Sequence, residues 1–345
     1  MSDAKRALIT GIDGQDGSYL AELLCDEEYE VHGLVRRAPD DEFPRLALVR
    51  DRVSLHWGDL LDEGSLARVI RRVQPTEIYN LAAAAYVPVS FDQPTLAADV
   101  TGLGATRMLH ATLEFAPTAR FFQATSGEIF GRSDSEVLDE GASVRPANPY
   151  GAAKAYAHSM VGYFRELRSA RKAGLWCCAG IAFNHESPRR GLGYVTRKIT
   201  HAAAAIKHGE KHELRLGNRA AVRDWGFAKE YVEAMCKMLR QDEPEDYVLA
   251  TGVGHTVQDV VDVAFARVGL DPEAHVAPLE DARPLDIDRL VGDPSKAADR
   301  LGWQASTSFE SLIEMMVDHD LRLIEGGLRS ELSGPALEAE LIRAS

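Results

Sequence analysis

The first half of the chain alternates short apolar runs with segments of helical periodicity. The apolar runs are rich in β-branched and aromatic residues, and they are "RALIT" (6–10), "YEVHGLV" (29–35), "VSLHWGD" (53–59), "EIYNLAA" (77–83) and "RFFQAT" (120–125). Between them the periodicity predicts helices over 18–27, 63–72 and 95–115. Strands and helices that alternate at this spacing predict a doubly wound parallel sheet with helices on both faces. Right-handed crossovers place the carboxyl ends of these strands at one edge, where ligands bind.

The second half is more irregular. Proline and glycine interrupt it at "NHESPRRGLG", "LRLGN" and "RPLDID", and helices are predicted near 194–208, 228–240, 256–268 and 308–324. We therefore expect an α/β protein with a Rossmann domain over 1–182 and a smaller mixed α/β substrate lobe over 183–327. We allow for one segment of that lobe returning to the first domain, and a weakly patterned polar tail follows over 328–345.

Composition narrows the class of protein. The 345 residues are 45% apolar and 27% charged, as in an ordinary soluble globular protein, and the net charge is −14. That charge argues against nonspecific binding to nucleic acid or to anionic membranes, because both need a basic surface. The four cysteines show no CxxC spacing, so we expect neither a disulfide scaffold nor a metal site. With no signal segment and no long apolar run, the sequence predicts a cytoplasmic protein.

The first predicted strand ends in "TGIDGQDGSYLAELL", which places Gly11, Gly14 and Gly17 at the start of a helix. Glycines let the turn tighten and let the backbone approach a pyrophosphate, whose charge is met by free N–H groups and the helix dipole. A glycine triplet alone could be a mere loop, but its place between a strand and a helix predicts a dinucleotide site. We assign the loop residues to cofactor binding, namely Gly11, Asp13, Gly14, Gln15, Asp16 and Gly17.

Two arginines follow the second strand, where an NAD site usually has an acidic residue. A guanidinium at Arg36 or Arg37 could clamp a 2′-phosphate in a two-pronged contact, which favours NADP over NAD. The alternative is a pair of solvated surface arginines. Asp59, followed by Leu60, ends the third strand and is placed to contact the adenine edge, although an Asp there could equally form a turn or cap a helix.

The stretch "NPYGAAKAY" places Tyr150 and Lys154 four residues apart, on one face of a helix. A nearby ammonium favours the phenolate, so we expect Lys154 to lower the pKa of Tyr150. A couple of dozen residues earlier, "QATSGEIFG" carries Ser126 at a strand end and the carboxylate Glu128 beyond it. The combination of Ser126, Tyr150 and Lys154 resembles the hydride-transfer triad of the short-chain dehydrogenase/reductase superfamily.

A closer resemblance extends over about residues 5–322. The segments that carry it are, in order, "ALITGIDGQDGSYLAELL", "QPTEIYNLAA", "NPYGAAKAYAH", "FNHESPRRG", "VTRKIT", "VRDWGFAKEYV", "EDYVLATG" and "RLVGDPSKAADRLGW". In these segments the chain resembles the GDP-mannose 4,6-dehydratases, which are hydro-lyases. The resemblance implies Ser126, Glu128, Tyr150 and Lys154 as catalytic residues.

The implied reaction is redox-neutral overall. Tyr150, assisted by Lys154, takes the proton of the C4 hydroxyl while hydride passes from C4 to NADP⁺. The ketone acidifies the C5 hydrogen, Glu128 removes it, and water leaves C6 with a proton from Ser126 or Glu128. Hydride then returns to C6, giving GDP-4-dehydro-6-deoxymannose. A simple reductase would have no use for the second acid/base group.

The same resemblance implies binding residues. On the cofactor side these are Leu81, Ala82, Ala83, Tyr150, Lys154, His185 and Arg190. On the substrate side they are Ser126, Glu128, Asn184, Val195, Lys198, Leu216, Gly217, Arg223, Arg283 and Asp286. The cations suit a diphosphate and Asp286 a ribose. Each has a plainer interpretation: Arg223 could pair with Asp224, Lys198 could be a surface lysine, and His185 a packed loop histidine.

Several positions depart from the family pattern. Ala84, Ala85 and Tyr86 replace a polar Gln-Ser-His run, Gly127 precedes the carboxylate where the family has Ser or Thr, and Ala282 replaces an aromatic residue. These changes leave open another nucleotide hexose or heptose as substrate. Two other classes also stay open: an epimerase or reductase that does not use Glu128, and a non-catalytic NADP-binding module.

We further expect a homodimer or homotetramer, since proteins of this superfamily commonly pair through a helical bundle. The segment "RRAPDDEFPRLALVR" (36–50) resembles a family loop that reaches a neighbour's cofactor.

Overall fold

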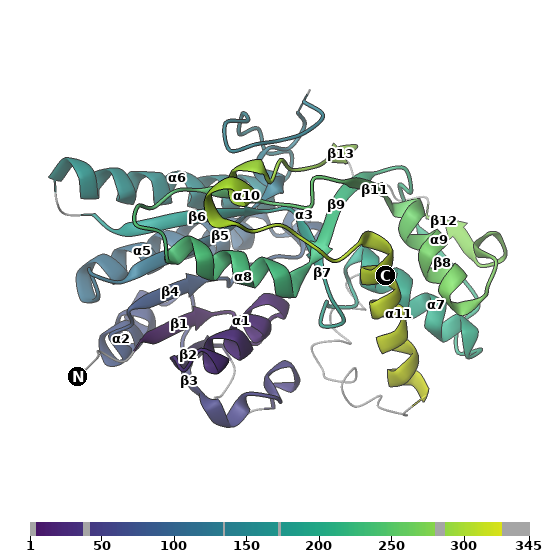
Figure 1. Ribbon diagram of the computed structural model, residues 1–345, viewed down its shortest axis with the longest axis horizontal. Helices are drawn as coiled ribbons and strands as arrows, with labels where there is room; N and C mark the ends of the chain where they lie inside the picture. The colour runs from purple at the N-terminus through teal and green to yellow at the C-terminus, as the bar shows by residue number, and fades with distance from the viewer. Residues whose placement is uncertain (1–4, 37–41, 134, 172–173, 280–286, 326–345) are drawn as a thin grey trace.

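The computed structural model describes residues 5–36, 42–133, 135–171, 174–279 and 287–325 (Figure 1). Within these ranges, seven strands form one large sheet in the order β3-β2-β1-β4-β5-β6-β10, and every neighbouring pair is parallel. The strands are β1 (Arg6–Thr10), β2 (Glu30–Val35), β3 (Val53–Trp57), β4 (Glu77–Asn80), β5 (Arg120–Ser126), β6 (Trp176–Ala182) and β10 (Tyr247–Leu249). The predicted doubly wound parallel sheet is confirmed.

The sheet is apolar on both faces because consecutive strand residues point to opposite sides. Tyr79 and Phe122 belong to one buried cluster, and their neighbours Ile78 and Phe121 belong to the other. The first cluster includes residues of α1 (Gln15–Asp26), α8 (Ala228–Leu239) and α10 (Ser295–Leu301). The second includes residues of α2 (Glu63–Val73), α5 (Gly104–Phe115) and α6 (Pro149–Arg171).

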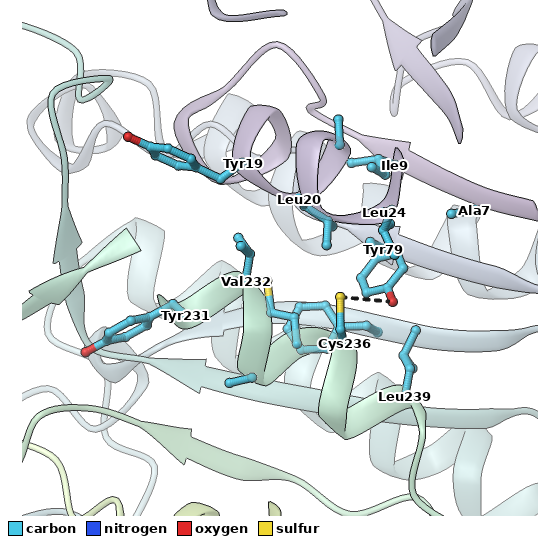
Figure 2. Packing of buried hydrophobic residues seen from close by; sticks show 14 of the residues in the cluster. Ala7, Ile9, Tyr19, Leu20, Leu24, Tyr79, Tyr231, Val232, Cys236 and Leu239 are labelled. Carbon is cyan, nitrogen blue, oxygen red and sulfur yellow. Dashed lines mark hydrogen bonds between the residues drawn. The ribbon is translucent and has the colours of Figure 1, made fainter. Parts of the chain in front are cut away.

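Helices α1 and α8 pack side by side over the first of these faces (Figure 2). Leu20 and Leu24 of α1 and Val232 of α8 point into the space between the two helices and the strands. The Tyr79 hydroxyl donates to Glu77 Oε2 at 2.7 Å and lies 3.6 Å from the Cys236 sulfur, so the phenol of a central strand has polar partners although it is buried. A helix from the second half of the sequence thus covers the large sheet.

One predicted helix differs from the structure. The segment predicted as a helix over 95–115 is divided into α4 (Pro94–Ala97), a π-helical turn η3 (Ala98–Leu103) and α5, with a further helix, α3 (Val87–Asp92), before it. Pro94 cannot continue a preceding helix, because it has no N–H to donate. The π turn turns Thr101 toward the segment after β4, where its hydroxyl accepts the N–H of Ala84 at 3.0 Å.

The second half builds a group of elements beyond the carboxyl ends of the large sheet (Figure 1). A small sheet contains β7 (Asn184–Glu186), β9 (Val222–Phe227), β11 (Gly254–Thr256) and β13 (Arg289–Leu290), and β8 (Leu214–Leu216) pairs with β12 (Val276–Pro278). Helices α7 (Val195–Lys207), α9 (Val257–Val268) and α11 (Phe309–Glu325) surround a core that includes Trp225 and Phe265. The remaining turns are 3-10 helices: η1 (Pro44–Leu46), η2 (Arg50–Arg52), η4 (Gly127–Ile129) and η5 (Pro272–Ala274).

The chain crosses between the two groups more than once. It leaves the large sheet after β6, forms β7 and β9, and returns through α8 to add β10 beside β6, with Tyr247 opposite Gly180. In the part of the chain that the structure describes, no helix is long and apolar enough to cross a membrane.

Candidate active site

The glycine loop between β1 and α1 is tightly packed. Gly11 has a positive φ of 68°, and a Cβ there would lie 3.0 Å from the Ala82 nitrogen. A Cβ on Gly17 would lie 2.2 Å from the Gly11 carbonyl oxygen, so no side chain fits at that position. Gly14 precedes α1 and has no side chain to cap it, which leaves the first N–H groups of the helix for a ligand. This is the donor set that a dinucleotide pyrophosphate needs.

Asp16 and His185 form an ion pair beside this helix start. The His185 Nε2 lies 2.9 Å from Asp16 Oδ2, and its Nδ1 lies 2.7 Å from the Phe183 carbonyl oxygen. Each ring nitrogen of His185 faces an acceptor, so both nitrogens must carry a hydrogen. Only the protonated imidazolium has two N–H donors. Burial disfavours both charges, but their mutual attraction prevails: it lowers the pKa of Asp16 to about 2 and raises that of His185.

Further contacts attach the segment after β6 to the same helix. The Gln15 side chain donates to the His185 carbonyl oxygen at 3.0 Å and accepts from the Ser187 hydroxyl at 2.8 Å. Arg189 donates to the Ser18 hydroxyl at 3.0 Å and to Glu22 at 2.6 Å. The "NHESPRRG" segment is therefore held on α1. Within it, His185 is packed against its own loop, and its imidazolium pairs with Asp16 at the start of α1.

The remaining cofactor candidates lie along the carboxyl edge of the sheet. Arg36 is exposed at the bend after β2, and Arg37 lies outside the described residues. Asp59 accepts the N–H of Leu61 at 2.9 Å, as a turn-forming Asp does, and Leu60 is buried. The half-buried run Leu81–Ala82–Ala83 follows β4, with Ala82 facing Gly11.

The four predicted catalytic residues come together where β5 ends and α6 begins. Ser126 ends β5, and its hydroxyl oxygen accepts the backbone N–H of Glu128 at 3.3 Å. Tyr150 and Lys154 lie on the first turns of α6, with the Lys154 ammonium 5.7 Å from the centre of the Tyr150 ring. The Lys154 Nζ donates to the Ala124 carbonyl oxygen at 2.7 Å, which ties α6 to β5.

The pKa of Tyr150 differs from the expectation drawn from its spacing to Lys154. Burial, together with the negative charge of Glu128, raises the pKa of Tyr150, while a hydrogen bond from Ser126 and the charge of Arg190 act to lower it. Burial also disfavours the charge of Lys154 and lowers its pKa to about 8. Ser126 and Arg190 are described groups that favour the phenolate.

Tyr194 and Tyr86 are site residues that the sequence reasoning did not identify as such. The Tyr194 ring lies between two groups: the Arg190 guanidinium carbon is 3.6 Å from its centre, and the Tyr86 ring meets it edge to face at 5.6 Å. Arg190 also lies 3.2 Å from the buried carboxylate of Glu186. Tyr86, which differs from the family pattern, therefore makes an aromatic contact with Tyr194, the residue that precedes α7.

Packing explains why the residue at position 127 is a glycine. A Cβ at this position would lie 3.1 Å from two carbons of the Phe183 ring, and Phe183 is only 2% exposed. The Phe183 ring stacks on Phe130 at 6.2 Å. The glycine thus accommodates a neighbouring aromatic ring, and space for a different sugar is not needed to explain it.

The substrate candidates are spread over the second group of elements. Asn184 begins β7, Val195 and Lys198 lie on the first turn of α7, and all three are half-buried. Leu216 is buried at the end of β8 and Gly217 is exposed after it. Three positions lie outside the described residues: Ala282, Arg283 and Asp286.

Arg223 and Asp224 do not form the pair that the plainer interpretation suggested. Asp224 accepts from the Thr251 N–H at 2.8 Å and hydroxyl at 2.7 Å, and from the Gly252 N–H at 2.9 Å. Arg223 donates to the carbonyl oxygens of Val222 and Ile287. Burial raises the pKa of Asp224, although these donors oppose it.

The described part of the segment 36–50 packs beside α1. Phe43, Leu46 and Val49 are buried in the cluster that contains α1, while Leu48 is 75% exposed. Arg45 donates to the Arg189 carbonyl oxygen at 2.9 Å. The predicted contact of this segment with a neighbouring chain stays a prediction.

Comparisons with known proteins agree with this arrangement. The sequence model of the family described as GDP-mannose 4,6 dehydratase matches residues 8–316. The chain is 46% identical over 332 residues to GDP-mannose 4,6 dehydratase 2 of Arabidopsis thaliana, covering 92% of this chain and 87% of that protein. It is 42% identical over 353 residues to the GDP-mannose 4,6-dehydratase of Sinorhizobium fredii, covering 94% and 99%.

Solved structures show the same fold. A UDP-glucose 4-epimerase of Thermus thermophilus in complex with NAD matches with a TM-score of 0.80 and 27% identity, over 91% of this chain and 98% of that one. The dTDP-glucose 4,6-dehydratase DesIV of Streptomyces venezuelae, with NAD bound, matches with a TM-score of 0.82 at 22% identity, over 94% and 98%. The second likeness concerns the fold alone.

Proposed function

The chain belongs to the GDP-mannose 4,6-dehydratase family, and on that premise we propose that it converts GDP-mannose to GDP-4-dehydro-6-deoxy-D-mannose with loss of water. The observation that carries the proposal is Glu128, a second ionisable group close enough to Tyr150 to perturb its pKa. An epimerase or a reductase needs one acid/base group at C4, whereas elimination of water across C5 and C6 needs another.

A nicotinamide dinucleotide is the cofactor. The tight glycine loop and the uncapped start of α1 fit its pyrophosphate, and the exposed Arg36 after β2 supports recognition of a 2′-phosphate. When bound, the nicotinamide accepts hydride from the hexose C4 and returns it to C6. The imidazolium of His185 and the guanidinium of Arg190 offset the charge of Asp16 next to the anionic ligand.

In the first step Tyr150 removes the proton of the C4 hydroxyl. Ser126 assists, because its oxygen accepts from the Glu128 N–H and its own O–H is left to donate to the phenolate. Lys154 holds the first turns of α6 on β5 through the Ala124 carbonyl oxygen. The C4 carbon becomes a ketone, which makes the adjacent C5 hydrogen acidic.

In the second step Glu128 removes the C5 proton and the C6 hydroxyl leaves as water. The leaving oxygen needs a proton, and either Glu128 or the Ser126 hydroxyl can deliver it. A C5–C6 double bond conjugated to the ketone remains until C6 is reduced and C5 is reprotonated. Overall, the substrate loses one molecule of water and undergoes no net oxidation.

The test is incubation of the purified protein with GDP-mannose, alongside other GDP-, UDP-, CDP- and dTDP-sugars, followed by mass spectrometry. We expect loss of one water from GDP-mannose with no net change in NADPH absorbance. Glu128→Gln should fold and bind cofactor but lower the dehydration rate by about 10²- to 10⁴-fold. Dehydration at the wild-type rate in this variant would refute the mechanism, and net NADPH consumption would indicate a reductase.

NADP is the proposed form of the cofactor. We expect Arg36→Ala to weaken NADP binding by about tenfold and to leave NAD binding unchanged, because only NADP carries the 2′-phosphate. Fluorescence titration of the apoprotein with both cofactors measures this. Equal losses for the two cofactors would show that Arg36 does not recognise the phosphate.

We also propose a homo-oligomer, a dimer or a tetramer. Large side chains are exposed on neighbouring helices, with Tyr163 53% and Tyr156 41% exposed on α6 and Leu103 45% exposed on η3. Sedimentation should give a multiple of the 37.8 kDa chain mass, and Tyr163→Glu should shift it toward the monomer. A monomeric wild type at micromolar concentration would contradict this.

A further inference from the structure

Asn148 precedes Pro149 at the start of α6 and is 8% exposed. Its side-chain oxygen accepts the N–H of Gly151 at 2.7 Å, and its backbone carbonyl accepts the N–H of Ala152 at 3.0 Å. Both contacts are those of a residue that caps a helix N-terminus. Its side-chain nitrogen makes a further contact, donating to Glu128 Oε2 at 2.7 Å.

The orientation of the Asn148 amide follows from its partners. The Gly151 N–H can only donate, so the amide oxygen must face it and the NH₂ group must face the Glu128 carboxylate. The amide cannot flip without placing two donors or two acceptors together. A cap that is fixed in this way presents a donor to Glu128 in one direction only.

The backbone of Glu128 also lies close to the same helical turn. A Cβ on Gly151 would lie 2.6 Å from the Glu128 carbonyl oxygen, so the missing side chain allows the close approach. Glu128 thus lies against the start of α6, the helix that carries Tyr150 and Lys154, and is bonded to it through Asn148. Within the described part of the chain, no hydrogen bond occupies the other carboxylate oxygen, Oε1, which is left for substrate.

We propose that Asn148 is a positioning residue for the C5 step, which holds the Glu128 carboxylate in one orientation relative to Tyr150. The inference rests on the proposed function, because the step exists only in a dehydratase. Asn148 acts through Glu128, because its NH₂ group donates to one carboxylate oxygen and so orients the other. The amide links the proposed C5 base to the helix that carries the proposed C4 base.

The competing interpretation is that Asn148 only caps α6. Asn148→Ser separates the two, because serine keeps the cap but has no NH₂ group to reach Glu128. Asn148→Asp also keeps the cap acceptor and places a second carboxylate against Glu128. A matched control is Thr256→Ala, which removes the cap of α9, where the Thr256 hydroxyl accepts the Asp259 N–H at 3.0 Å.

If Asn148 positions Glu128, Asn148→Ser should keep near wild-type stability and KM while kcat falls about 10- to 100-fold. The isotope effect for GDP-mannose deuterated at C5 should increase, because C5 abstraction becomes rate-limiting. Asn148→Asp should be slower still. Thr256→Ala should lose stability with unchanged kcat. If Asn148→Ser kept the wild-type kcat and the wild-type isotope effect, Asn148 would act only as a helix cap and the proposal would be wrong.

A measurement without substrate keeps this inference separate from the identity of the sugar. The infrared carboxylate band that disappears in Glu128→Gln belongs to Glu128, and we expect Asn148→Ser to shift that band. An unshifted band would overturn the proposal whatever the substrate. If the wild type dehydrates no nucleotide sugar, the proposed function and the C5 role both fail, while a shifted band would still show that Asn148 orients Glu128.

Discussion

Lys154 is an ammonium placed where a charge is costly. It is 3% exposed, and its single hydrogen bond among the described residues goes to the Ala124 carbonyl oxygen. Burial lowers the pKa of Lys154 from 10.5 to about 8. A protein selected for stability alone would place an apolar side chain here, so the position indicates a site at which function costs stability.

The cost has a defined pH dependence. Below pH 8 Lys154 is protonated in both the folded and the unfolded chain, so folding bears the full free-energy cost of burying the ammonium. Between pH 8 and 10.5 Lys154 is protonated only in the unfolded chain, so the free energy of unfolding increases as the pH rises. Lys154→Met should abolish activity and gain stability relative to wild type at pH 7, on the order of 3 kcal/mol at most. Thermal melts should show this difference shrinking by pH 10. A difference independent of pH would show that burial does not shift the pKa of Lys154.

The sequence says more about which groups are candidates for the chemistry than about their surroundings. Ser126, Tyr150 and Lys154 are proposed from a strand end and a helical spacing, which are local patterns, and the resemblance to the family adds Glu128. Tyr194 and Asn148 could not be found in that way, since their contacts depend on how separate loops meet. The reason for Gly127 lies in Phe183, whose ring reaches it from the adjacent strand end.

At the scale of elements, α7 is fixed to α11 by a buried ion pair. The Arg197 Nε donates to Asp320 Oδ1 at 2.9 Å, and the Thr200 hydroxyl donates to Asp320 Oδ2 at 2.8 Å. Arg197 is 3% exposed and Asp320 is fully buried. Because α7 also carries Val195 and Lys198, this pair determines where the substrate candidates lie.

Removing one partner of that pair should be strongly destabilising. Asp320→Ala leaves the Arg197 guanidinium buried without its counter-charge, and we expect a loss of about 3–5 kcal/mol in the free energy of unfolding. The control is Asp318→Ala on the same helix, which breaks an exposed pair with Arg267 and should change little. Urea unfolding of both variants tests this, and similar midpoints for the two would contradict it.

The first five strands of the large sheet, β1 to β5, could be predicted from periodicity because each is a continuous apolar run between helices, whereas β6 and β10 were not predicted. The helices of the second half were likewise placed close to their observed bounds. The segment 95–115 was not, because the π turn at Ala98–Leu103 serves a contact between Thr101 and Ala84 that no local pattern encodes. The two- and three-residue strands of the small sheet are too short to show alternation.

For the whole molecule, the four cysteines are buried and unpaired in disulfides. Burial raises the pKa of Cys177 and of Cys236 to about 12, and it also raises that of Cys25 and Cys178. Thiols of this kind are poor nucleophiles and serve as small apolar side chains.

We therefore expect the native protein to resist thiol-modifying reagents. A chromogenic disulfide reagent should release almost no colour from the folded protein within minutes and should report four thiols after denaturation. Activity should be the same with and without a reducing agent. Rapid modification of the native protein would show that one of these side chains becomes accessible by local opening.

The position of β10 has a consequence for biosynthesis. During translation β6 is complete at Ala182, with every residue of "WCCAGIA" buried in the finished protein, but its outer neighbour ends only at Leu249. At about 5–20 residues per second the ribosome takes several seconds to synthesise the residues between the end of β6 and the end of β10. Throughout that interval the nascent sheet has an open apolar edge, which is the feature that invites pairing with another chain. Truncation at 182 would make this transient exposure permanent, so the first 182 residues should be a poor choice for separate expression.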